Sequence, residues 1–134
     1  MHSAETVLFQ SHISVVDDDQ SFRDSMRRLL KSMDYTVAVF PSAAEFLASP
    51  EFDDTACLVA DIHMPEMTGV DLYEHLIKTG HAIPTILVTA YPIDGVRKRM
   101  MTLGVVCYLP KPLVEAELIH CLELALARSQ APGS

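Results

Sequence analysis

The sequence predicts an α/β fold: a doubly wound, five-stranded parallel sheet in a three-layer sandwich, with helices on both faces. Three observations predict it. Short apolar or β-branched runs alternate with helical patterns five times along the chain. The runs are continuously apolar rather than alternating with polar residues, which is typical of strands covered on both faces. Polar residues gather where the runs end, and ligands bind at that edge of such sheets.

In the first two strand–helix units, the spacing of apolar residues changes from that of a strand to that of a helix. Residues 13–16 form an apolar run that ends in three aspartates, and residues 20–33 carry apolar side chains at helical spacing. Residues 35–40 are β-branched and aromatic. Ser42 follows them and can cap a short helix that ends at Ala48.

Three further units follow in the same order. Gly104 ends the fourth predicted helix, because glycine is a common residue just past a helix C-terminus. The expected strands and helices are 57–60 and 70–78, 83–89 and 93–103, and 105–109 and 113–128.

At 134 residues the chain fits one domain. We therefore expect a leader at 1–11, a domain at 12–128, and an exposed tail or linker start at 129–134.

The composition excludes several classes of function. Eighteen acidic and ten basic residues give a formal charge of −8. A segment this acidic is poorly suited to binding the phosphate backbone of a nucleic acid, so we expect no direct nucleic-acid binding by it. No apolar run approaches the roughly 18 residues of a membrane span, and the first residues do not resemble a signal peptide. We expect a cytoplasmic protein without membrane contact.

The three cysteines are odd in number, widely spaced and set among apolar residues. No CxxC pair or cysteine–histidine ligand pair accompanies them. We therefore expect reduced, buried thiols, with neither a disulfide nor a zinc site. They are Cys57, Cys107 and Cys121.

Polar residues that could bind a cation and a phosphoryl group lie at the ends of four predicted strands. Asp17 and Asp18 end the first strand, and Asp61 ends the third. Thr89 ends the fourth strand, and Lys111 follows the fifth. A parallel sheet would bring these ends to one edge. Carboxylates this close repel one another unless a cation neutralises them, and Mg²⁺ is the expected type of ion.

This set predicts phosphoryl transfer to a carboxylate. Asp61 would be the nucleophile and form an aspartyl-phosphate, while Lys111 and Thr89 contact phosphoryl oxygens. A bound ion would neutralise the charge that develops. The simpler alternative is that aspartates at strand ends cap the next helix, a role for which Asp19 is a candidate. Capping explains any one aspartate better, but five polar residues at four strand ends favour a functional site.

Four motifs resemble those of receiver domains from two-component response regulators. They occur in the family's order and spacing and cover roughly residues 12–128, and the Asp-x-x-Met-Pro-x-Met-x-Gly stretch is specific. The resemblance implies a flavodoxin-like (CheY-like) fold with strand order 2-1-3-4-5. Within this family, the motif sequences most resemble those of regulators of the nitrogen-fixation and LuxR-type group. The motifs are Val-Val-Asp-Asp-Asp at 15–19, Asp-Ile-His-Met-Pro-Glu-Met-Thr-Gly at 61–69, Val-Thr-Ala at 88–90 and Tyr-Leu-Pro-Lys-Pro at 108–112.

The resemblance implies a role for each matching acidic position. Asp17 and Asp18 match the metal-binding pair, and Asp61 matches the phospho-acceptor, which is also a metal ligand. The backbone carbonyl of His63 would complete the protein's ligands to Mg²⁺. The chain would be no enzyme beyond its own phosphorylation and dephosphorylation.

The remaining matched positions imply a switch. Thr89 matches the hydroxyl that turns toward the phosphoryl group, and Tyr108 matches the aromatic residue that follows it. Lys111 matches the phosphate-contacting lysine, and the Lys111–Pro112 peptide bond is expected to be cis.

The resemblance also implies the partners. The phosphoryl donor would be a phosphohistidine on a sensor histidine kinase or on a histidine phosphotransfer protein. The surface of the fourth helix, fifth strand and fifth helix (93–103, 105–109 and 113–128) would change on activation and could support a homodimer.

Two other classes of function remain open. One is a receiver-like protein-interaction module that is not phosphorylated, which the intact set of acidic residues, Thr89 and Lys111 argues against. The other is a Mg²⁺-dependent phosphatase, which would need a second acid two residues after the nucleophile, where His63 stands.

Tyr91, which departs from the usual pattern of the family, and a basic run suggest further hypotheses. Bulky Tyr91 and His63 would flank the acceptor and hinder attacking water, which would make the phosphorylated state long-lived. The basic run at 97–99 is either a solvated helix face or a partner contact.

Overall fold

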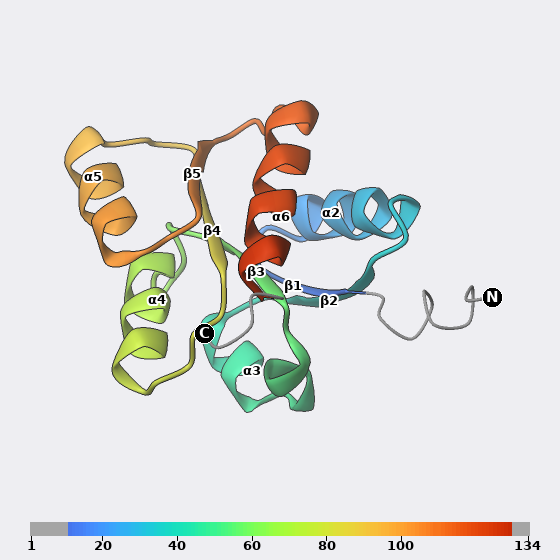
Figure 1. The fold of residues 1–134 in the computed structure, drawn as a ribbon, viewed down its shortest axis with the longest axis horizontal. Helices are drawn as coiled ribbons and strands as arrows, with labels where there is room; N and C mark the ends of the chain where they lie inside the picture. Colours follow the sequence, from blue (N-terminus) through green and yellow to red (C-terminus); the bar gives the residue numbers. More distant parts are fainter. Residues whose placement is uncertain (1–10, 130–134) are drawn as a thin grey trace.

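Five parallel strands in the order β2-β1-β3-β4-β5 form the centre of this computed structural model, which describes residues 11–129 (Figure 1). This order confirms the predicted one. Residues 1–10 and 130–134, which belong to the predicted leader and tail, lie outside the described residues. The strands are β1 His12–Val16, β2 Thr36–Phe40, β3 Cys57–Asp61, β4 Thr85–Thr89 and β5 Cys107–Pro110.

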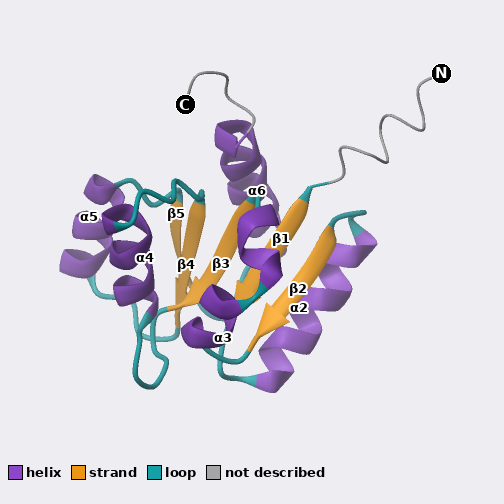
Figure 2. Ribbon diagram, turned by 90° about the horizontal axis from the view of Figure 1, so that it is seen from below, coloured by secondary structure: helices purple, strands orange, loops and turns teal. Residues whose placement is uncertain are grey.

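Helices cover both faces of the sheet (Figures 1 and 2). One face carries α2 Gln20–Ser32 and α6 Glu115–Ser129. The other carries α3 Ala43–Ala48, α4 Gly69–Lys78 and α5 Asp94–Leu103. Every residue of β3 and β4 is buried, as the continuously apolar strand pattern predicts. The two apolar clusters, one on each face, hold the sheet edge with the polar residues in place.

Local signals in the sequence set the ends of several helices. The carboxylate of Asp19 accepts the first-turn N–H bond of α2, and the Ser42 hydroxyl does the same for α3, which confirms both predicted caps. Gly104 ends α5 in the left-handed region at φ 117°, also as predicted. At the start of α4, Thr68 and Asp71 form a reciprocal capping box.

Some element bounds differ from the predicted ones, for reasons visible in the backbone. The N–H of Ile83 donates to His81 within a turn, so β4 begins at Thr85 rather than at 83. The N–H of Val105 donates to the carbonyl of Met100 at the end of α5, so β5 begins two residues later than predicted. An unpredicted 3₁₀ helix, Pro50–Asp54, lies between α3 and β3.

The expectation of three reduced cysteines is wrong for two of them. Cys107 of β5 and Cys121 of α6 form a disulfide, with their Cα atoms 6.1 Å apart. Fourteen residues separate them in the chain, and only the packing of α6 against the sheet brings them together. Cys57 is free and buried, as expected.

Within residues 11–129, no helix is both long enough and apolar enough to cross a bilayer.

Candidate functional site

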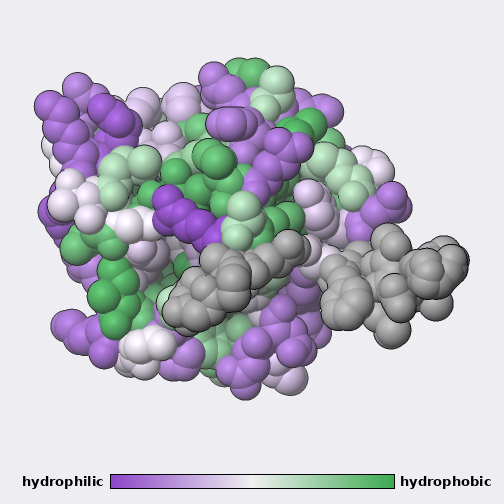
Figure 3. Space-filling view, viewed as in Figure 1, coloured by the Kyte–Doolittle hydropathy of each residue, from purple (hydrophilic) through white to green (hydrophobic). Residues whose placement is uncertain are grey.

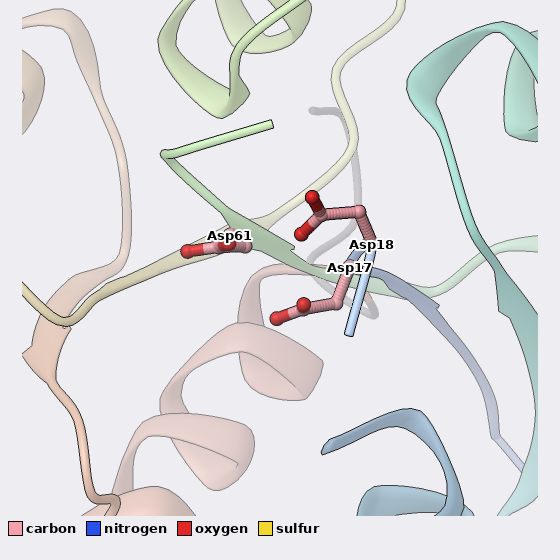
Figure 4. A group of neighbouring side chains, drawn as sticks. All are labelled: Asp17, Asp18 and Asp61. Atoms are coloured by element: carbon pink, nitrogen blue, oxygen red, sulfur yellow. The ribbon is translucent and has the colours of Figure 1, made fainter. Parts of the chain in front are cut away.

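Three carboxylates meet at the carboxyl edge of the sheet. Asp17 and Asp18 directly follow β1, and Asp61 is the last residue of β3. The neighbouring pair Val16 and Ala60 lie opposite each other in the parallel register, so the aspartates that follow them are adjacent. One oxygen from each carboxylate lies within 4.8 Å of the others. Figure 4 shows all three side chains extending to the same side of the strand ends, so the predicted trio is brought together.

Lys111 lies within this acidic group. Its ammonium donates to Oδ2 of Asp17 at 2.8 Å and lies 3.7 Å from Oδ1 of Asp61. Asp17 is fully buried, and its Oδ1 accepts the backbone N–H of Asp19 at 2.9 Å. The same ammonium lies 4.2 Å from the centre of the Phe22 ring, a cation–π contact. This contact of Phe22 could not be predicted, since an apolar residue in a helix stripe is normally a core residue.

The pKa of the Asp61 carboxyl is raised from its ordinary value. Burial is the largest cause, and the charge of Asp17 raises it further. The ammonium of Lys111 and a backbone hydrogen bond from His63 lower it, but they do not offset the burial. The charge of Asp18 raises it as well, so both neighbouring carboxylates add to the effect of burial.

The donor set fits a hard divalent cation. Carboxylate oxygens are the ligands that Mg²⁺ prefers, and the ion usually keeps several waters. Asp17 and Asp61 are buried, whereas Asp18 is exposed, so the three carboxylates border solvent. Water molecules from the solvent could complete the coordination shell of the ion. The backbone carbonyl of His63 as a further ligand stays a prediction.

The two predicted switch residues both hold the loop between β4 and α5. The hydroxyl of Thr89, which is fully buried, accepts the backbone N–H of Tyr91 at 3.0 Å. The phenol oxygen of Tyr108 accepts the backbone N–H of Ile93 at 3.2 Å. Thr89 and Tyr108 are therefore linked to consecutive parts of one loop, which their positions in the sequence did not reveal.

Gly69, the last residue of the longest motif, has a steric role. A Cβ built there would lie 2.5 Å from the carbonyl oxygen of Asp61, and the Gly69 N–H donates to the carbonyl of Ile62 at 3.1 Å. The start of α4 thus packs directly on the end of β3 at Asp61. The Lys111–Pro112 peptide bond on the opposite side of the site is cis, as predicted.

His63 and Tyr91 are in contact with each other. Their rings meet edge to face with centroids 5.4 Å apart, although the Tyr91 side chain is 70% exposed. The pair comes from the residues that follow β3 and β4. Its predicted effect on attacking water stays a prediction.

The basic run on α5 is largely paired within the chain. Arg97 lies 3.7 Å from Asp94 on the same helix, and Arg99 forms an ion pair with Glu74 of α4. Hydrophilic residues dominate the surface over α5, at the upper left of Figure 3. These contacts favour a solvated helix face over a basic patch that is free to bind a partner.

An apolar groove of about 560 Å³ lies beside Lys111. It is formed by α2 and by the residues that lead from β5 into α6. Its lining includes Phe22, Met26, Leu29, Leu113 and Leu118.

These features define a class of protein. An acidic trio, a lysine and a buried hydroxyl lie at the carboxyl edge of a 2-1-3-4-5 parallel sheet, which is the arrangement that the resemblance to receiver domains implies. Residues 13–123 match the family model of the response regulator receiver domain, and the chain belongs to this family.

Known relatives agree with this assignment. The chain is 32% identical over 127 residues to the response regulator protein TodT of Pseudomonas putida, covering 91% of this chain and 56% of TodT. It is 35% identical to nodulation protein W of Bradyrhizobium diazoefficiens (88% and 52% covered) and 32% identical to the transcriptional regulatory protein FixJ of Azorhizobium caulinodans (90% and 57%). The matches to FixJ agree with the resemblance to nitrogen-fixation regulators. The chain spans about half the length of these relatives.

Solved structures show the same fold. The response regulator StyR superposes with a TM-score of 0.83 at 35% identity, covering 90% of this chain and 61% of StyR. The structure titled FixJ-N superposes with a TM-score of 0.78 at 29% identity, covering 88% and 94%.

Proposed function

We propose that this receiver domain is phosphorylated on Asp61 in a Mg²⁺-dependent reaction and acts as a switch in two-component signalling. The donor is a phosphohistidine on a sensor histidine kinase or on a histidine phosphotransfer protein. The observation that carries the proposal is the meeting of Asp17, Asp18 and Asp61 with Lys111 at one sheet edge. Apart from its own phosphorylation and dephosphorylation, the domain catalyses no reaction.

The chemical step is an in-line displacement at phosphorus. A carboxylate oxygen of Asp61 attacks the phosphorus, the new O–P bond forms, and the N–P bond to the donor imidazole breaks. The imidazole leaves with the electron pair of that bond and takes up a proton from solvent. Mg²⁺ bound by the acidic trio and the carbonyl of His63 would supply positive charge to the phosphoryl oxygens. The Lys111 ammonium lies close enough to Asp61 to reach another of these oxygens.

The new phosphoryl group carries about 1.5 to 2 negative charges beside Thr89, in place of the single charge of the free carboxylate. The Thr89 hydroxyl accepts a bond from Tyr91 and keeps its own proton, which it can donate to a phosphoryl oxygen. Movement of Thr89 would pull on the loop that Tyr108 also holds through Ile93. Phosphorylation would then shift the population of conformations at the surface of α5, β5 and α6.

The partners follow from this arrangement. The groove beside Lys111 suits an apolar helix face on the donor protein, because such a helix could bring its phosphohistidine to Asp61. A homodimer through α5, β5 and α6 is part of the proposal, and the exposed side chains of Met101, Leu103 and Leu124 offer it apolar contact area. We place the domain in the cytoplasm, without direct nucleic-acid binding by this segment.

Intact-mass analysis after incubation with acetyl phosphate tests the proposal. Wild type should gain one phosphoryl group with Mg²⁺ and none with excess chelator. Asp61→Asn should gain none under either condition, since the amide is no nucleophile. Equal adducts on Asp61→Asn and wild type would overturn the assignment of Asp61 as the acceptor, and no adduct on wild type would overturn the proposal in favour of an interaction module.

A further inference from the structure

The disulfide between β5 and α6 has no role in the phosphoryl chemistry. Cys107 and Cys121 have Cα atoms 6.1 Å apart, within the range of about 4.4–6.8 Å that disulfides span. They come from different elements, so the pairing depends on the fold and not on a local loop.

The helix does not need this bond in order to pack. Leu118 and Leu122 of α6 are fully buried, and Ala125 is too. The two cysteines themselves belong to the same apolar surroundings. A reduced pair would therefore leave the fold in place, with two small apolar side chains in contact.

Exposure to solvent differs between the two cysteine residues. Cys107 is partly exposed, whereas Cys121 is 4% exposed. A small thiol or disulfide can therefore reach Cys107 first, and Cys121 is placed to resolve the mixed product. Disulfides in cytoplasmic proteins are usually transient and redox-sensing, and the cytoplasm is where the proposed function places this domain.

We propose that Cys107 and Cys121 are a redox-responsive dithiol–disulfide pair, closed by glutathione-type disulfides and opened by dithiol reductants. The Cys107 thiolate attacks one sulfur of the glutathione disulfide and releases one glutathione thiolate. The Cys121 thiolate then attacks Cys107 Sγ in the mixed disulfide and releases the second. Two protein thiols and one glutathione disulfide give one protein disulfide and two glutathione thiols, with both thiol protons ending on glutathione.

The crosslink acts on the strand that carries Tyr108. Successive strand residues point to opposite faces, so Cys107 packs with the α6 cluster while Tyr108 packs with the α5 side. Tyr108 also holds the backbone N–H of Ile93 at the start of α5. Closing the disulfide fixes β5 to α6 and thereby restrains the Tyr108 contact with the loop before α5.

Thiol counting in glutathione buffers tests the redox pair without any phosphoryl donor. The protein is equilibrated at a series of glutathione ratios, quenched in acid, unfolded, alkylated with N-ethylmaleimide and weighed. Wild type has three cysteines, so it should carry three adducts when reduced and one when oxidised. Cys57→Ala should change from two adducts to none, and Cys107→Ser should keep two at every ratio.

Two results would overturn the proposal. One is a wild type that forms no crosslink in excess glutathione disulfide, seen as three N-ethylmaleimide adducts, or as two adducts with one stably bound glutathione. The other is a crosslink in folded wild type that dithiothreitol opens only after unfolding, which would make the bond permanent. Neither result depends on whether Asp61 is phosphorylated, so this test can fail while the proposed function stands.

Thermal unfolding and amide exchange test the effect on β5. Oxidation should raise the Tm of wild type and of Cys57→Ala by roughly 5–15 °C and leave that of Cys107→Ser unchanged. Exchange of the Ile93 amide should slow on oxidation in the same two proteins. An unchanged Tm in wild type, or an Ile93 amide that exchanges equally fast in both states, would contradict the restraint on β5.

Discussion

The ammonium of Lys111 lies 2.8 Å from the buried carboxylate of Asp17, closer than the 3.7 Å that separates it from Asp61. Before any metal binds, the lysine thus occupies a carboxylate that the proposed function assigns to Mg²⁺. A divalent ion must share or displace this contact, and a displaced ammonium would move toward Asp61. Metal binding and lysine position are therefore coupled.

Replacing Lys111 with alanine should tighten Mg²⁺ binding about five-fold, because one competing positive charge is removed from Asp17. Isothermal titration calorimetry at neutral pH measures the affinity directly. Lys98→Ala is the matched control, since it removes an exposed lysine of α5 and should leave the affinity unchanged. An affinity equal to or weaker than that of wild type in Lys111→Ala would show that the lysine does not compete.

Gly69→Ala should destabilise the domain by about 1–3 kcal/mol, because its Cβ would lie 2.5 Å from the Asp61 carbonyl oxygen and must push α4 away. Gly95→Ala is the control, since nothing lies within 4 Å of the Cβ built there, on α5. It should stabilise the domain by up to about 1 kcal/mol. Urea unfolding gives both values, and equal effects would refute the steric role of Gly69.

Tyr91→Ala should speed loss of the phosphoryl group by roughly 2–5-fold, because the small side chain opens the approach of water beside His63. Tyr91→Phe keeps the ring that contacts His63 and should retain the wild-type rate. The phosphoryl donor is removed from the phosphorylated protein, and the phosphorylated fraction is then measured over time by intact-mass analysis. If alanine and phenylalanine variants both decay like wild type, the ring does not shield the acceptor.

The buried thiol of Cys57 should make stability depend on pH in the alkaline range. Burial raises the pKa of Cys57 from its ordinary 9.0 to about 12. Above pH 9 the thiol ionises in the unfolded chain but stays protonated in the folded one. Its stabilising contribution is therefore complete below pH 9 and is lost as the pH rises toward 12, at about 1 kcal/mol per pH unit.

Urea unfolding at several alkaline pH values checks this dependence, with the disulfide kept closed throughout. Burial also raises the pKa of Tyr35 and of Tyr73, so some loss of stability should remain in Cys57→Ala. The informative quantity is the difference in slope between wild type and this variant. Parallel slopes would mean that Cys57 ionises equally in both states.

The fold and most of the site could be predicted from local patterns. The apolar runs, the caps at Asp19 and Ser42, and Gly104 act through their own segments, so the sequence reports them directly. The meeting of Asp17 with Asp61 followed from one general property, that parallel strands align their carboxyl ends.

Features that depend on contacts between distant segments could not be predicted in this way. The disulfide needs the crossing of α6 over β5, and the contact of Lys111 with Phe22 needs the packing of α2 beside the β5–α6 loop. Composition and spacing favoured free thiols, because an odd number of cysteines without a CxxC pair carries no sign of pairing. The steric need for Gly69 likewise appears only once α4 lies against β3.

The most direct test of the central claim locates the phosphoryl group on the chain. Protein treated with acetyl phosphate and Mg²⁺ is reduced with borohydride, which converts an aspartyl-phosphate into homoserine, and is then digested and sequenced by mass spectrometry. Homoserine is expected at Asp61 alone, and none in the sample without Mg²⁺. Homoserine at Asp17 or Asp18 instead, or unchanged aspartate at all three positions, would contradict it.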